Sequence, residues 1–166
     1  MHIGLSAAAA LVMGLLTVIS SESRAATVGL AGVETSVTVT ADLGALGLSG
    51  APFGTATVAL VDDRPVFTFP ITGGSLDLAT GAALIKHDGS GVTLSAGGTS
   101  ATVGNFLIDT AQSLVFGDLI DALTGDSLLA GLDLFEFGAG MDLPGVELLI
   151  TSTLAGALTD TFGAAD

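Results

Sequence analysis

Apolar residues recur at every second position in several short runs after residue 26, and Gly, Asp or Pro residues bound these runs. Because successive side chains of a strand point to opposite faces of a sheet, this alternation predicts strands with one buried and one solvated face. The clearest run covers residues 33–40. Its expected buried face carries Val33, Thr35, Val37 and Val39.

A hairpin is expected next along the chain. The alternation returns over residues 56–60, with the even-numbered positions on the expected buried face, and again over 67–71. Asp62-Asp63 lies between the two runs and supplies the turn. Because proline has no N–H to donate to a neighbouring strand, the second strand is expected to end at Pro70 or to lie at a sheet edge.

Glycine-rich turns divide the next part of the chain at intervals of about ten residues, a spacing typical of an antiparallel β-sandwich or barrel. The turns are expected at 73–74, 88–91 and 97–98, and the strands near 75–78, 82–87, 91–96 and 100–108.

The apolar pattern is less regular after residue 113. Residues 114–123 fit a strand or a short helix, and 128–137 changes parity, which requires a bulge or a strand buried on both faces. Residues 146–150 predict a further strand.

At the C-terminal end the apolar period changes to four. We expect one helix of about ten residues, with Ser152 or Thr153 as N-cap and Gly163 as its end. This helix would cover an open end of the sheet, with Phe162 as the plug. Its expected apolar face carries Leu154, Leu158 and Phe162. The predicted fold is therefore mainly antiparallel β, a sandwich or barrel with one short C-terminal helix.

The N-terminus has the form of a secretory signal peptide. An uncharged apolar run from Ile3 to Ile19 is followed by small residues before a cleavage position after Ala25. Only His2 stands where a basic residue is usual, and the run is near the short limit of a membrane span, so an uncleaved anchor is the alternative. We expect residues 1–25 to be the signal peptide and 26–166 a single exported domain, located in the periplasm, at the cell surface or outside the cell.

The charge excludes several kinds of partner. The formal net charge of the 166 residues is −14, and Arg64 and Lys86 are the only Lys or Arg residues after residue 25. Such an acidic surface repels phosphate backbones and anionic lipid headgroups, so neither nucleic-acid binding nor peripheral membrane binding is expected. No membrane span is expected after signal cleavage either. Solubility is the preferred explanation of the acidity, with salt adaptation or calcium binding as alternatives. Without cysteine, no disulfide or thiol-linked lipid anchor is available.

The residue types also argue against catalysis. Gly125-Asp126-Ser127-Leu128 spells the signature of an esterase family whose serine needs a histidine base downstream, and no histidine follows His87. We therefore expect a turn there. Glycoside hydrolysis by paired carboxylates is disfavoured because the chain has no Trp or Tyr to form a sugar platform. The chain is expected not to be an enzyme.

Three sets of residues remain as candidate sites. His87, with Asp88 to orient its ring, could bind a metal or move a proton; the alternative is a partly exposed histidine at a strand end. Asp62, Asp63 and Asp88 at strand ends could meet around calcium, the alternative being that aspartates simply favour turns. Six phenylalanines form either a core or the lining of an apolar cavity. They are Phe67, Phe69, Phe106, Phe116, Phe135 and Phe137.

Three stretches, 66–77, 85–94 and 105–109, together with the ending 151–163, resemble exported bacterial β-domains of the kind that often carry a Pro-Glu-Pro-type C-terminal sorting tail. That tail is missing before Asp166, so anchoring through it is not expected. The layout is more distantly similar to HtaA-type haem-uptake domains, in which a tyrosine ligates iron. Because this chain has no tyrosine, that resemblance leaves only His87 as an iron ligand.

The sequence thus predicts a non-catalytic, exported structural protein of the cell surface or extracellular matrix, acting through self-association or envelope and matrix components. The alternative is a carrier for an apolar small molecule or haem. In that case the phenylalanines would line a cavity of several hundred Å³, with His87 at its mouth.

Overall fold

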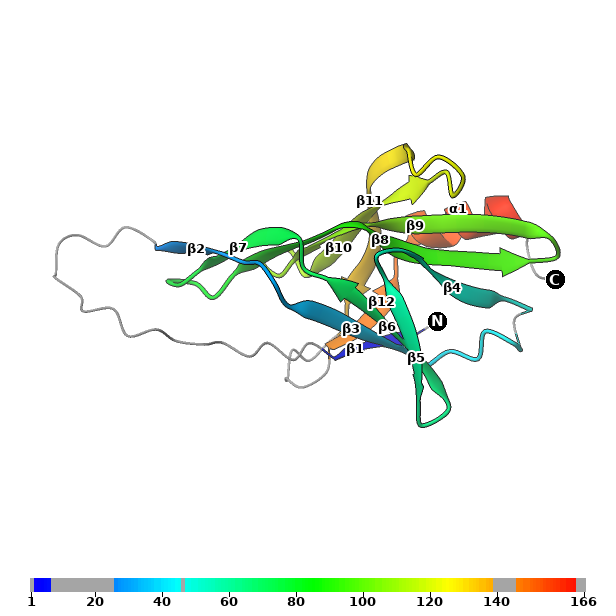
Figure 1. Cartoon of the computed structure of the whole chain (residues 1–166), viewed down its shortest axis with the longest axis horizontal. Coiled ribbons are helices and arrows are strands. Elements are labelled where there is room, and N and C mark those ends of the chain that lie inside the picture. Colours follow the sequence, from blue (N-terminus) through cyan, green and yellow to red (C-terminus); the bar gives the residue numbers. More distant parts are fainter. Residues whose placement is uncertain (1, 7–25, 46, 139–145, 164–166) are drawn as a thin grey trace, which may run out of the picture.

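The computed structural model describes residues 2–6, 26–45, 47–138 and 146–163, and most of them belong to strands (Figure 1). The strands form one hydrogen-bonded sheet in the order β2-β7-β8-β9-β10-β11-β12-β1-β3-β6-β5. The remaining strand, β4, pairs with β8 beside this path. All of these pairs are antiparallel. The elements are β1 (His2–Ser6), β2 (Thr27–Gly29), β3 (Glu34–Val39), β4 (Ser49–Gly54), β5 (Thr57–Val61), β6 (Arg64–Pro70), β7 (Gly73–Asp77), β8 (Ala83–Ala96), β9 (Thr99–Asp109), β10 (Leu114–Ile120), β11 (Ser127–Phe137), β12 (Val146–Ile150) and α1 (Ser152–Phe162).

The sheet folds over itself into two facing layers, as in a β-sandwich. Phe67 and Phe69 of β6 belong to the core between the layers, where the rings of Phe69 and of Phe106 on β9 meet edge to face at 5.2 Å. Within the described residues β2 and β5 each have a neighbour on one side only, so the sheet is open and the barrel alternative is not realised. The predicted class, mainly antiparallel β with one C-terminal helix, is confirmed.

The β5–β6 hairpin is confirmed, but the expected burial of β5 is wrong. Asp62 and Asp63 both have positive φ, 50° and 60°, as a two-residue type I′ turn requires, and β6 ends at Pro70. Val58 and Leu60 are nevertheless exposed, by 42% and 74%. The reason is position: β5 is the last strand of the sheet, and Figure 1 shows the hairpin projecting beyond the rest of the molecule.

The turn expected at 88–91 is instead a bulge inside one 14-residue strand, β8. His87 is opposite Phe106 and Gly91 is opposite Gly104, so three residues of β8 face the single Asn105. Asn105 has a φ of 51° and accepts a hydrogen bond from the N–H of Gly89 at 2.8 Å. Glycine therefore marks a break in register here rather than a reversal of the chain.

The parity change in 128–137 is caused by a bulge, the first of the two alternatives given for this segment. Val115 of β10 is opposite Phe135, and Phe116 is opposite Asp133, which leaves Leu134 as the extra residue. Leu134 is fully buried, and it packs so close to Gly117 that a Cβ there would lie 2.6 Å from the leucine side chain. Residues 114–120 form strand β10, so the helix alternative for this segment is not realised.

The C-terminal helix is confirmed, but its N-cap is one residue earlier than expected. The hydroxyl of Thr151 accepts a hydrogen bond from the N–H of Leu154 at 3.2 Å, and Gly163 ends the helix with a φ of 80°. Leu154 is buried, whereas Phe162 is only half-buried. No described helix is long and apolar enough to cross a bilayer.

Candidate ligand cavity around His87

An apolar cavity of about 100 Å³ lies between the two layers. Seven strands, β3, β6 and β8 to β12, contribute to its wall together with helix α1. Leu154 and Leu158 close it on the helix side, so these leucines occupy the place expected for Phe162. Only two lining residues, Thr35 and His87, have polar side chains.

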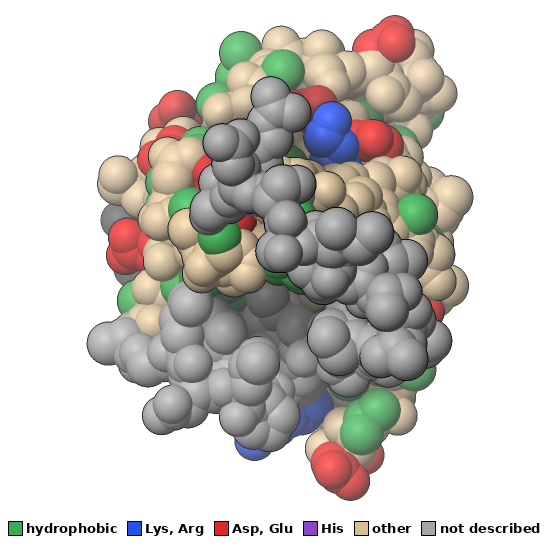
Figure 2. Space-filling view, turned by 90° about the vertical axis from the view of Figure 1, so that its left-hand side faces the viewer, with side chains coloured by type: hydrophobic (Ala, Val, Ile, Leu, Met, Phe, Trp, Pro, Cys, Tyr) green, Lys and Arg blue, Asp and Glu red, His purple; other side chains and the backbone are tan. Residues whose placement is uncertain are grey.

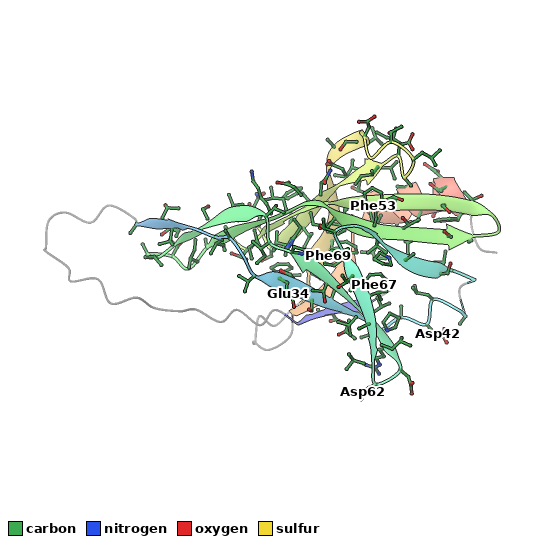
Figure 3. The ribbon with its side chains drawn as sticks, viewed as in Figure 1. Glu34, Asp42, Phe53, Asp62, Phe67 and Phe69 are labelled. Atoms are coloured by element: carbon green, nitrogen blue, oxygen red, sulfur yellow. The ribbon has the colours of Figure 1, made fainter. Side chains whose placement is uncertain are left out.

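Four of the six phenylalanines predicted to line a cavity do so: Phe67, Phe69, Phe106 and Phe135. Figure 3 shows Phe67 and Phe69 inside the molecule, between the layers. Phe116 and Phe137 are not part of the lining. On β10 the neighbouring Val115 takes the position that faces the cavity, so alternation turns Phe116 to the other face.

The volume limits what the cavity can hold. Pockets for drug-sized ligands are typically about 300–1,000 Å³, whereas an engineered cavity of about 150 Å³ binds benzene. The volume of this cavity is near the smaller figure and below the range for drug-sized ligands. This cavity is therefore smaller than the several hundred Å³ expected for a carrier.

His87 lies inside the wall rather than at a mouth or an exposed strand end. It is 1% exposed, and its Nδ1 is 2.9 Å from the carbonyl oxygen of Pro70 on β6. Because a carbonyl oxygen can only accept, Nδ1 carries the proton, and the lone pair of the neutral ring is on Nε2. The ring is also packed edge to face with Phe69, at 6.2 Å between centroids. Pro70, and not the exposed Asp88, orients the imidazole.

Nε2 of His87 is left without a partner. It is the only buried side-chain nitrogen or oxygen of the described residues that makes no hydrogen bond. Burial lowers the pKa of His87 below its ordinary value of 6.5, although hydrogen bonding to the carbonyls of Pro70 and Phe69 and the charge of Asp88 act in the opposite direction. The imidazole is therefore neutral at pH 7 and offers one buried acceptor.

The bulge in β8 fixes the position of His87. The hydroxyl of the fully buried Ser90 donates to the carbonyl of His87 at 3.0 Å, and a Cβ on Gly91 would lie 2.3 Å from the carbonyl oxygen of Val103. Only glycine allows β8 and β9 to approach so closely at this point. Asn105 was not among the expected site residues, and its positive φ and its hydrogen bond from the N–H of Gly89 hold the other side of the bulge.

Ser127 of the esterase signature belongs to a polar cluster centred on Asp118, in which His87 makes no hydrogen bond. Its hydroxyl donates to Asp118 at 2.5 Å, and Asp118 also accepts from the side chain of Asn105 at 3.0 Å and from the N–H of Gly131 at 2.9 Å. Burial acts to raise the pKa of Asp118, but these three hydrogen bonds outweigh it and leave the pKa below its ordinary value. The arrangement fixes β11 to β10 and provides no base for a nucleophile.

The structure does not bring the candidate calcium ligands together. Asp62 and Asp63 form the tip of the β5–β6 hairpin, at the far end of the molecule in Figure 3, and Asp88 is in the β8 bulge. Over the described ranges, no three His, Cys, Asp or Glu side chains are close enough to hold a metal ion. Figure 2 likewise shows acidic side chains scattered over one face rather than gathered.

Other aspartates accept hydrogen bonds from backbone N–H groups in turns, the role given as the alternative to calcium binding. Asp77 accepts from the N–H of Ala79 at 2.8 Å, and Asp109 accepts from the N–H of Ala111 at 2.9 Å. The hydrogen bond from the side chain of Gln112 is the main reason that the pKa of Asp109 is below its ordinary value.

Comparison of the chain with protein-family models, with curated proteins and with solved structures found no match. The resemblances to exported bacterial β-domains and to HtaA-type domains therefore stay predictions from the residues quoted for them.

Proposed function

We propose that this protein is a non-catalytic, exported structural component of the cell surface or extracellular matrix, and that its copies associate through the open edge of the sheet. The observation that carries the proposal is the state of β5. All five of its residues are exposed, and its only described neighbour is β6. The edge opposite β6 therefore offers backbone N–H and C=O groups for pairing.

The composition of β5 supports this role. Natural edge strands are usually protected from pairing by charged residues, proline or bulges. The β5 sequence, Thr-Val-Ala-Leu-Val, contains no charged residue and no proline. Its pairing with β6 runs without a register shift from Thr57 to Val61. An uncharged, regular and apolar edge is what a strand needs in order to add another strand.

A second copy of β5 is the partner that fits. If two copies pair antiparallel about Ala59, Val58 of each lies opposite Leu60 of the other, and the exposed apolar faces are continuous. The acidic turn then lies beyond the last paired residue, so Asp62 does not face an acid of the other copy. The net charge of −14 still repels the copies, and salt should strengthen association by screening that charge.

Signal cleavage would add further edges. β1 lies between β12 and β3 and pairs with both. Removal of the expected leader 1–25 would take β1 away and leave one side of β3 and one side of β12 without their present neighbour. A mature chain with these edges and β5 could extend beyond a dimer.

Light scattering of the full chain tests the proposal. We expect a dimer or larger species whose mass rises with salt. Leu60→Lys places a charge on the edge strand and should give a monomer, while Leu123→Lys serves as the matched control, because Leu123 is also exposed but lies in the turn between β10 and β11. A wild-type chain that stays monomeric at every salt concentration contradicts the proposal.

The carrier alternative is retained in a narrower form. The apolar cavity between the layers favours an apolar ligand, and the volume of about 100 Å³ restricts that ligand to a molecule much smaller than haem.

A further inference from the structure

We infer that residues 27–31 of one copy replace β1 in a second copy once the leader has been cleaved, so that exported copies join by exchanging a strand. The binding site is the slot between β3 and β12, which β1 occupies in the full chain. The inference rests on the proposed export with cleavage after Ala25, and it does not depend on the β5 edge.

The slot between β3 and β12 needs a strand with an apolar face. β1 is antiparallel to both neighbours, and Ile3 is opposite Val39 of β3 and Leu148 of β12. Val39 and Leu148 are buried and belong to the hydrophobic core. Loss of β1 leaves backbone N–H and C=O groups of both strands without partners beside this core, and that costs free energy until another strand pairs with them.

The sequence of residues 27–31 matches that of β1 position by position. β1 reads His-Ile-Gly-Leu-Ser, and 27–31 reads Thr-Val-Gly-Leu-Ala, so both have a β-branched residue second, Gly third and Leu fourth. In the register of β1, Val28 takes the position of Ile3, and Leu30 takes that of Leu5. Because opposite residues of antiparallel strands share a face, Val28 and Leu30 would both lie on the core side of the sheet.

This segment is weakly held where it lies in the full chain. β2 has three residues, all exposed, and its only described neighbour is β7. Exchange gives up the three residue pairs between β2 and β7, and it can form four pairs with each wall of the slot, as β1 does. Val28, which is 45% exposed, also becomes buried, and burial of apolar area favours the exchange.

The recipient is a second copy because folding back into the same copy would disrupt the core. In the register of β1, a hairpin within one chain would make residues 32–35 its loop. The N–H of Ile71 donates to the carbonyl of Val33 at 2.6 Å, and Thr35 is buried opposite Phe69 of β6. These contacts keep 32–35 extended, and Figure 1 shows β2 at one end of the molecule, away from β1. Each copy then donates one strand and accepts one, a heterologous contact that extends into chains or rings.

Disulfide trapping tests the inference, since the chain has no cysteine of its own. In the register of β1, Gly29 of the donor is opposite Thr38 of the recipient, a separation that a disulfide can span. The exported form of Gly29→Cys/Thr38→Cys, recovered from cells that express the full chain, should give a ladder of linked copies on a non-reducing gel. Thr80→Cys/Thr38→Cys is the matched control, because Thr80 is also exposed but lies in the turn after β7, and it should not give the ladder.

Leu60→Lys separates this exchange from association through β5. Added to Gly29→Cys/Thr38→Cys, it should leave the ladder unchanged, whether or not β5 associates. Loss of the ladder in this background would assign the links to the β5 edge and overturn the inference. A link within one copy, the same ladder in the control, no link at all, or an exported chain that keeps residues 1–25 would overturn it as well.

A second measurement needs no variant of the protein, in case the cysteine variants fail to fold. A synthetic peptide of residues 1–8 contains β1 and should refill the slot, so the mass of the exported wild-type chain in light scattering should fall when the peptide is added. The same peptide with Ile3→Asp and Leu5→Asp should have no effect, because it places charges opposite buried apolar positions. A mass that the first peptide leaves unchanged would contradict strand exchange.

Discussion

The strands around His87 and the β5–β6 hairpin share one sequence pattern, yet their side chains lie in opposite environments. In β9 the alternating pair Ala101 and Val103 is buried between two layers, and so is the pair Phe106 and Ile108 after the change of parity at Asn105. In β5 the alternating Val58 and Leu60 are exposed, because no second layer covers the end of the sheet. Alternation therefore shows which residues share a face, whereas burial depends on what the rest of the fold places over that face.

The two regions also differ in regularity. β5 pairs with β6 without a register shift, whereas β8 and β11 both have bulges where they cross the core. The bulges place His87 and Leu134 in the interior, and glycines make the close approaches possible. The irregular part holds the candidate cavity, and the regular part offers the edge for association.

The largest expected effect comes from truncating the core. Leu134→Ala should lower the free energy of unfolding by about 2–5 kcal/mol, because it leaves a hole beside Gly117 and Phe106. Leu60→Ala, the same change on the exposed edge, should stay within about 0.5 kcal/mol. Urea unfolding at one low protein concentration measures both. Similar losses at the two sites would remove the contrast between the regions.

Adding a methyl group at the bulge should have the next largest effect. Gly91→Ala brings a Cβ to 2.3 Å from the carbonyl oxygen of Val103, and we expect it to cost about 1–3 kcal/mol. Gly73→Ala is the matched control, because a Cβ at this strand position has no heavy atom within 4 Å. Thermal unfolding of the two variants compares them. A stable Gly91→Ala chain would show that β8 and β9 are further apart than described.

Acid should destabilise the region around His87. Because burial lowers the pKa of the folded-state imidazole below 6.5, the unfolded chain takes up the proton first as the pH falls. Stability from the neutral ring is complete above pH 6.5 and declines below it, by at most about 1.4 kcal/mol per pH unit for one proton. Unfolding free energies at pH 7, 6 and 5 should show this slope in the wild type.

His87→Leu supplies the control for the pH series. Its unfolding free energy should depend less on pH over the same range, while losses below pH 4 remain, since the lowered pKa values of Asp109 and Asp118 belong to a more acidic range. Equal slopes in the wild type and the variant would contradict a buried neutral histidine.

The smallest effect is expected at Ser127. Ser127→Ala removes one of the three hydrogen bonds to Asp118, so the pKa of Asp118 should rise and the unfolding free energy should fall by less than about 1 kcal/mol. NMR titration of the carboxyl carbon of Asp118 measures the pKa. Asp126→Asn in the same turn is the control, because it leaves these three hydrogen bonds intact and should not change the pKa of Asp118. An unchanged pKa of Asp118 in Ser127→Ala would mean that the serine does not donate a hydrogen bond to Asp118 in solution.

The sequence alone was enough to predict the elements that are defined by their own apolar period and their own turn or cap residues. The alternation predicted β3, β6 and β12, the Asp62-Asp63 turn predicted the hairpin, and the four-residue period predicted α1. The N-cap was misplaced because residues 151–153 are all able to cap. Thr151 takes the role because its hydroxyl also donates to the carbonyl of Asp133 at 2.5 Å, a contact from a distant strand.

The candidate site was only partly predictable because its geometry also depends on contacts from strands that are distant in the sequence. Four glycine or turn-forming residues at 88–91 suit a reversal and a bulge equally, and only the neighbouring β9, through Asn105, decides between them. His87 was identified as the candidate side chain, but its burial depends on Pro70 of another strand. Sequence reasoning identified the chemistry of the residue and not its surroundings.

Hydrogen exchange of the β5 amides tests the central claim most directly. If copies of the full chain associate through this edge, the amides of Thr57–Val61 that point away from β6 should exchange more slowly as the protein concentration rises, while those of β2, at the opposite end of the strand order, change less. Fast exchange of β5 at every concentration would mean that the edge stays open to water, and would contradict a role through strand-to-strand association.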